Sequence, residues 1–106
     1  MSRYGGSSDY TVTHVLNHMD DIIEVIEDIN TNGANSPQVS IPNTQEATNR
    51  AMQENIGALQ EMLEWEPEAN PIPGNAPRPN MKTYSGDKST YTDAITLGQA
   101  YIAANT

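Results

Sequence analysis

The chain contains no cysteine and few apolar residues for its length of 106 residues. Without cysteine it forms no disulfide bond, no thiolate metal site and no cysteine nucleophile, so nothing covalent supports the fold. Apolar residues account for 36% of the sequence, below the roughly 45–50% typical of soluble domains. The length corresponds to about one domain, and so small a core has low net stability unless other subunits contribute to its burial.

Basic residues are scarce as well. The chain has 5 Lys and Arg and 14 Asp and Glu, which gives a formal net charge of −9. Phosphate backbones and anionic lipid surfaces repel a chain with this charge. No apolar run approaches the roughly 20 residues that span a bilayer, and the start of the chain lacks the apolar segment of a secretory signal peptide. We therefore expect protein partners, no direct contact with nucleic acid or membrane, and a cytoplasmic location unless the chain is carried in a virion.

The strongest pattern in the sequence predicts an amphipathic helix within residues 11–30. Its apolar residues recur at spacings of three and four, and its acidic residues fall on the opposite side. Asn32 and Gly33 tolerate the left-handed backbone of a helix C-cap and predict where this helix ends. The predicted packing face consists of Val12, Val15, Leu16, Met19, Ile22, Ile23, Ile26 and Ile29.

A second helix is predicted to follow a loop over residues 31–42, which contain glycine and two prolines. Asn43 and Glu46 have the spacing of a capping box, and Pro67 stops the helix after about Trp65. The two helices form an antiparallel hairpin over residues 11–65. The predicted contact residues of the second helix are Met52, Ile56, Leu59, Leu63 and Trp65.

A flank of Ala51, Ala58 and Trp65 lies beside the apolar seam of this second helix. The seam itself is narrower than the apolar face of the first helix. The flank is therefore a candidate contact surface for another chain.

Residues 66–88 hold five of the seven prolines, which predicts an extended, polyproline-like strap. No P-x-x-P spacing occurs, so an SH3 ligand is disfavoured. The strap also carries three of the five basic residues. It either crosses the acidic face of a neighbour or simply links two elements. Its candidate interaction residues are Pro71, Pro73, Pro77, Arg78 and Pro79.

Residues 89–106 predict a third helix, with a strand as the alternative. Thr90 and Asp93 resemble a capping box, and the small residues Ala94 and Gly98 permit close approach of another helix. The predicted fold is therefore all-α, with a helical hairpin and a C-terminal third helix. A flexible leader at 1–10 and the proline-rich strap at 66–88 complete the predicted organisation.

The sequence offers no catalytic motif and little metal-binding chemistry. His14 and His18 are separated by four residues on the first predicted helix, which is formally a metal-ligand spacing. The pattern is not H-E-x-x-H, however, and no distant residues complete a ligand set. Phosphate-binding glycine loops, nucleophile elbows and acidic calcium loops are also missing. We therefore expect no enzyme activity, no metal and no cofactor.

Three functional hypotheses of different classes follow. The first is a non-enzymatic structural protein of a large assembly, present as a homo-oligomer or bound to larger virion proteins. A small, cysteine-free, lysine-poor chain rich in Asn, Thr and Ser is typical of tailed-phage head-decoration, connector or tail-adaptor proteins. The second is an acidic phage-type inhibitor that mimics nucleic acid, and the third is a cellular helical adaptor module.

Overall fold

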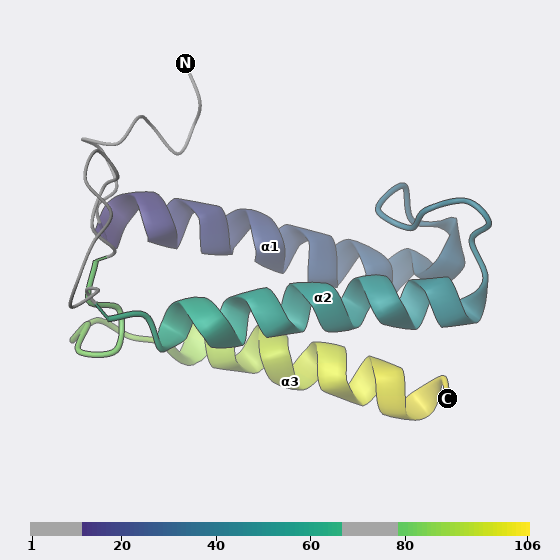
Figure 1. Cartoon of the computed structure of the whole chain (residues 1–106). Helices are drawn as coiled ribbons and strands as arrows, with labels where there is room; N and C mark the ends of the chain where they lie inside the picture. The colour runs from purple at the N-terminus through teal and green to yellow at the C-terminus, as the bar shows by residue number, and fades with distance from the viewer. Residues whose placement is uncertain (1–11, 67–78) are drawn as a thin grey trace, which may run out of the picture.

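The protein is described by a computed structural model over residues 12–66 and 79–106. Within these two ranges it contains helices and no strand. Helix α1 covers Val12–Asn32, the 3-10 turn η2 covers Gly33–Asn35, α2 covers Gln45–Leu63 and α3 covers Ser89–Ala104. Helix α2 runs antiparallel to both α1 and α3 (Figure 1). The all-α prediction, including the third helix, is confirmed.

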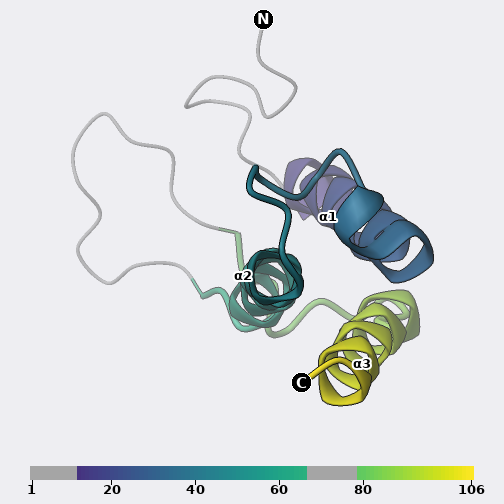
Figure 2. The ribbon, with the colours of Figure 1, turned by 90° about the vertical axis from the view of Figure 1, so that its right-hand side faces the viewer.

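The three helices form a bundle in which each packs against the other two. Viewed along their axes, the three helices occupy the corners of a triangle, with α2 at one corner and α1 and α3 at the other two (Figure 2). The predicted leader at 1–10 lies outside the described residues. Among the residues predicted in the strap, Pro71, Pro73, Pro77 and Arg78 lie outside them as well.

Helix α1 ends where the sequence predicts. Gly33 follows the last helical residue and has a φ of 58°, the left-handed region that glycine adopts without a steric penalty. The side chain of Asn32 donates a hydrogen bond of 2.6 Å to the carboxylate of Asp28, one turn earlier. The glycine therefore ends the helix and turns the chain toward α2.

The start of α2 differs from the prediction by one residue. Thr44, not Asn43, is the N-cap, and its hydroxyl oxygen accepts a 3.0 Å hydrogen bond from the amide of Ala47. The side chain of Asn43 instead donates a 2.7 Å bond to the carbonyl of Ala34, across the loop. Both residue types cap helices well, and the loop contact decides which one does so here.

The start of α3 is also capped differently from the prediction. The helix begins at Ser89 with Lys88 as its N-cap residue, so Thr90 and Asp93 lie within the helix and form no capping box. The carboxylate of Asp87 accepts a 2.8 Å hydrogen bond from the Ser89 amide. The backbone and side-chain hydrogen bonds from Ser89 lower the pKa of Asp87. A carboxylate at this position satisfies one of the unpaired amides of a helix N-terminus.

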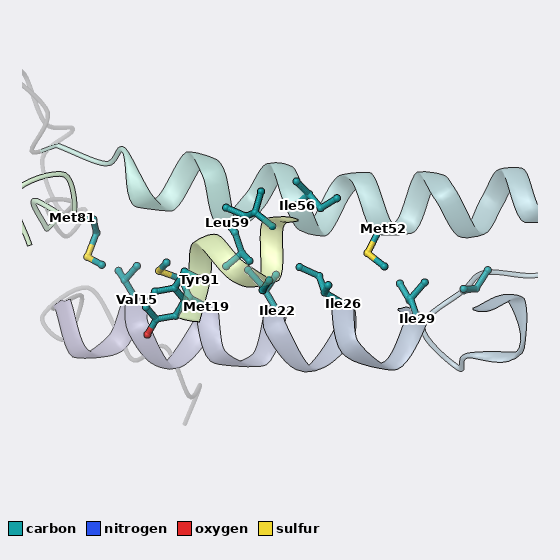
Figure 3. Packing of buried hydrophobic residues seen from close by; sticks show 13 residues of the cluster. Val15, Met19, Ile22, Ile26, Ile29, Met52, Ile56, Leu59, Met81 and Tyr91 are labelled. Carbon is teal, nitrogen blue, oxygen red and sulfur yellow. The ribbon is translucent and has the colours of Figure 1, made fainter. Parts of the chain in front are cut away.

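The interior is a single apolar cluster to which all three helices contribute. Side chains of α1 and α2 point toward one another along the length of the bundle (Figure 3). Met81 joins them at the end near Val15, although the sequence pattern assigned it to the strap. The buried cluster consists of Val15, Met19, Ile22, Ile26, Ile29, Val39, Met52, Ile56, Leu59, Met81, Tyr91, Ala94 and Ile95.

The described part of the predicted strap, residues 79–88, is joined to the end of α2. The carbonyl oxygen of Trp65 accepts hydrogen bonds from the amides of Met81, at 2.8 Å, and Lys82, at 3.1 Å. The ammonium group of Lys82 lies 3.7 Å from the carboxylate of Glu66. Met81, whose exposed fraction is 0%, anchors this part of the chain in the core, where burial of its side chain is favourable.

Close packing of α3 on α2 depends on Gly98. A Cβ atom at this position would lie 2.8 Å from both Cγ1 and Cδ1 of Ile56, and 3.1 Å from the sulfur of Met52. Real Cβ atoms do not approach so closely without displacing their neighbours. Gly98 is therefore required by packing, as its spacing from Ala94 predicts.

Two glycine substitutions test this packing against a matched control. Gly57, in the middle of α2, has no atom within 4 Å of the position a Cβ would take. Gly57→Ala should therefore raise the free energy of unfolding by about 0.5–1 kcal/mol through helix propensity alone. Gly98→Ala gains the same helix propensity, but its methyl group overpacks the contact with Ile56 and Met52. Its free energy of unfolding should therefore be about 1–3 kcal/mol lower than that of Gly57→Ala. Urea unfolding followed by circular dichroism measures both, and equal stabilities would contradict the packing of Gly98.

Candidate interaction surface

Most of the apolar residues predicted to make contacts pack inside the chain itself. Five of them are half-buried at the edge of the core and pack against it: Val12, Leu16, Ile23, Leu63 and Trp65. Pro79 is half-buried too. The remaining eight residues are fully inside the cluster and offer no surface to a partner: Val15, Met19, Ile22, Ile26, Ile29, Met52, Ile56 and Leu59.

The alanine flank of α2 is partly covered by the chain. Ala51 and Ala58 are half-buried against the core, and Trp65 packs there as well. Ala51 also lines a hollow of about 240 Å³ together with Ser40 and Arg50. The flank therefore contributes to intramolecular packing and leaves only a small hollow at the surface.

The outward face of α3 is almost free of charge. Asp93 is the only charged residue among the 16 of this helix. The side chain of Leu97 lies on this face and is 37% exposed. Among the described residues, one other large apolar side chain is exposed, that of Ile41 in the loop before α2. The exposed residues of α3 are Ser89, Thr90, Thr92, Asp93, Thr96, Leu97, Gln99, Ala100, Ala103 and Ala104.

Helix α1 contrasts with α3, because it carries five carboxylates and no lysine or arginine. Asp20, Glu24 and Glu27 are exposed, and the other two, Asp21 and Asp28, are half-buried. The amphipathic pattern predicts this acidic side correctly. Glu27 of this side lines a groove together with Asp93 and Leu97 of α3, a pairing that the linear sequence does not reveal.

A groove of about 440 Å³ lies between α1 and α3. Its apolar lining comes from Ile23 of α1 and from Ala94 and Leu97 of α3. Its lining residues come from α1 and α3, which lie side by side (Figure 2), and none comes from α2. The six lining residues are Ile23, Glu27, Thr90, Asp93, Ala94 and Leu97. Only Ile23 was among the predicted interaction residues.

The two helices that line the groove are joined by a hydrogen bond. The hydroxyl of Tyr91 on α3 donates to the carboxylate of Asp20 on α1 at 3.3 Å. Burial raises the pKa of Tyr91 to about 12, with further contributions from the Asp20 charge, its hydrogen bond and Tyr84. The bond fixes the register of α3 against α1 beside the groove.

None of the lysines and arginines of the described residues lines the groove, although Lys88 is the N-cap residue of α3. Arg50 is 3.3 Å from Glu46 on α2. Lys82 pairs with Glu66, and the ammonium group of Lys88 donates to the carbonyl of Lys82 at 3.1 Å. The groove is therefore bordered by carboxylates, with no lysine or arginine on either of its helices.

The two histidines of α1 are four residues apart, as the sequence shows. His14 and His18 are half-buried, and within residues 12–66 and 79–106 no group of three or more His, Asp or Glu side chains is arranged to hold a metal ion. In the same ranges, none of the helices has the length and apolar character needed to cross a membrane.

No protein-family model matches the chain, and neither a curated protein nor a solved structure matches it. The surface of the chain itself combines three features: the face of α3 with Asp93 as its one charge, the acidic side of α1 and the groove between them.

Tyr91→Phe tests the contact between α1 and α3 through its pH dependence. Because the pKa of Tyr91 is raised from 10.0 to about 12, the folded state favours the protonated phenol. This contribution to stability is complete below pH 10 and is lost as the pH rises through about 12. We expect the wild-type free energy of unfolding to fall more steeply between these pH values than that of Tyr91→Phe.

Urea titrations between pH 8 and 12 measure this difference. At pH 7 the substitution should cost only about 1 kcal/mol, the usual contribution of one hydrogen bond. Asp20→Asn should lower the pKa of Tyr91, because it removes the adjacent negative charge. If the free energy of unfolding changed equally with pH in the wild type and in Tyr91→Phe, the contact between Tyr91 and Asp20 would be contradicted.

Proposed function

We propose that the chain is a non-enzymatic subunit of a larger protein assembly and that it docks through the exposed face of α3. The observation behind this proposal is the composition of that face, which carries Thr96, Leu97, Ala100, Ala103 and Ala104 with Asp93 as its only charge. Charged residues are normally frequent on the solvent-facing side of a helix and depleted at the centre of a protein interface, so a face with a single charge favours a covered state.

The rest of the chain favours the same interpretation. A net charge of −9 keeps the chain dispersed, yet α3 carries only one charged residue, Asp93. Small side chains such as Ala100 and Ala104 permit the close approach of a partner backbone, as Gly98 does within the bundle. Interfaces between subunits are depleted of charge at their centres in the same way.

Among large assemblies, we propose a tailed-phage virion as the setting, with the chain as a head-decoration, connector or tail-adaptor protein. This part of the proposal is supported by composition alone: the chain is small, lacks cysteine and has few basic residues. Its partners would be further copies of itself or larger virion proteins. Mass spectrometry of purified virions tests this setting, and absence of the chain from them would contradict it.

A second candidate function, mimicry of nucleic acid, is favoured by the row of exposed carboxylates on α1. Asp20, Glu24 and Glu27 follow one another at four and three residues, or about 6 and 4.5 Å along the helix axis. A basic groove on a nucleic-acid-binding protein would attract this row. If this function is correct, a DNA or RNA competitor should release the partner, whereas docking through α3 should resist it.

Charge introduced on α3 tests the proposed function. Thr96→Lys combined with Ala100→Lys places two ammonium groups on its outer face. Desolvation of these charges should prevent docking while leaving the helix folded. The matched control is Gln53→Lys with Gln60→Lys, which adds the same charge to the exposed side of α2.

Sedimentation of extracts from the native host gives the measurement. The wild type and the α2 control should sediment in a complex much larger than the 11.6 kDa chain, and the α3 variant should sediment as the free chain. Circular dichroism establishes that all three are equally helical. The proposal is wrong if the wild type sediments as a free monomer, or if the α3 variant remains in the complex.

A further inference from the structure

We infer that the groove between α1 and α3 binds a basic amphipathic segment of a partner protein. This inference rests on the proposed function and specifies which chemistry the partner presents. Three observations support it: the shape of the groove, the charges at its border, and the composition of residues 1–11 and 67–78.

The shape of the groove suits aliphatic side chains projecting from a helix. Ala94, at its base, is small and buried. Ile23 and Leu97 stand on opposite sides, one from each helix. Thr90 and Leu97 are seven residues apart, which corresponds to about 10 Å along α3. Two aliphatic side chains one turn apart on a partner helix, about 6 Å along its axis, fit within this length.

The border of the groove selects for positive charge. Glu27 and Asp93 lie one on each side of it, and both are exposed. Helices α1 and α3 together carry six carboxylates and no lysine or arginine. A partner segment with aliphatic residues on one face and Lys or Arg beside them therefore complements both the base and the border.

The chain itself supplies no such segment. Residues 1–11 contain one basic residue, Arg3, and one acidic residue, Asp9. Residues 67–78 contain Glu68 and Arg78, again one of each sign. A second copy would bring a net charge of −9 to an acidic border, which opposes self-association at this site. The occupant is therefore a segment of a different, basic protein.

A synthetic peptide serves as the probe. It is a fluorescein-labelled helix of about 18 residues, with leucines three and four residues apart and lysines at the other positions. A peptide of the same composition, with the leucines scattered around the helix, is the control ligand. Fluorescence anisotropy should show that the full-length protein binds the amphipathic peptide at least about tenfold more tightly than the scattered one.

Two double variants with identical charge changes isolate the groove. Glu27→Lys with Asp93→Lys reverses the two border charges. Glu54→Lys with Glu61→Lys makes the same change on the exposed side of α2. The groove variant should weaken binding of the amphipathic peptide at least about tenfold, and the α2 variant no more than about threefold, because distant surface charges are screened.

A third variant tests the apolar part of the groove. Leu97→Ser removes an aliphatic side chain that is already 37% exposed, so the fold should be retained. It should weaken binding of the amphipathic peptide and leave binding of the scattered peptide unchanged. Thermal unfolding followed by circular dichroism establishes that each variant is folded.

Several outcomes would overturn this inference. Equal affinity for the two peptides would show that only overall charge matters, and equal losses in the two charge variants would show that the groove is not the site. Self-association abolished by Leu97→Ser would assign the groove to a second copy. If Thr96→Lys with Ala100→Lys disrupts the native complex while the groove variants leave it intact, the proposed function stands and the inference fails.

Discussion

The arrangement of the bundle depends on how closely α3 approaches α2 at Gly98. With no Cβ at this position, the backbone of α3 lies against Ile56 and Met52, both of which are fully buried. A larger residue would separate these two helices. The approach holds the inner residues Tyr91 and Ile95 in the core and leaves the opposite side of α3 exposed. A chain with so few apolar residues cannot fill a wider interior.

Local sequence signals predict the helices well but not every residue that begins them. The regular spacing in α1 and the glycine after it are determined by neighbours in the sequence, and both predictions are confirmed. Asn43 is by residue type the better cap, yet Thr44 caps the helix because the side chain of Asn43 is bonded to Ala34 across the loop. Met81 was missed for a similar reason, because its burial depends on Trp65, which is distant in sequence.

The candidate surface was harder to predict than the fold. The pattern of α3 identifies an inner face, but it does not show that Leu97 would stand beside Ile23 of α1. The groove exists because two helices distant in sequence lie in parallel, with Ala94 too small to fill the space between them. The acidic side of α1 was evident from the sequence. Its position beside α3, which has Asp93 as its one charged residue, was not, because that pairing is a property of the tertiary structure.

The hydrogen bonds to the Trp65 carbonyl have a consequence for engineering the chain. They hold Met81 and Lys82 next to the end of α2. Both bonds join main-chain atoms, so a substitution of the Trp65 side chain leaves their donors and their acceptor in place. The indole ring can therefore be exchanged to report on the packing of this end of the bundle without removing the hydrogen bonds that close it.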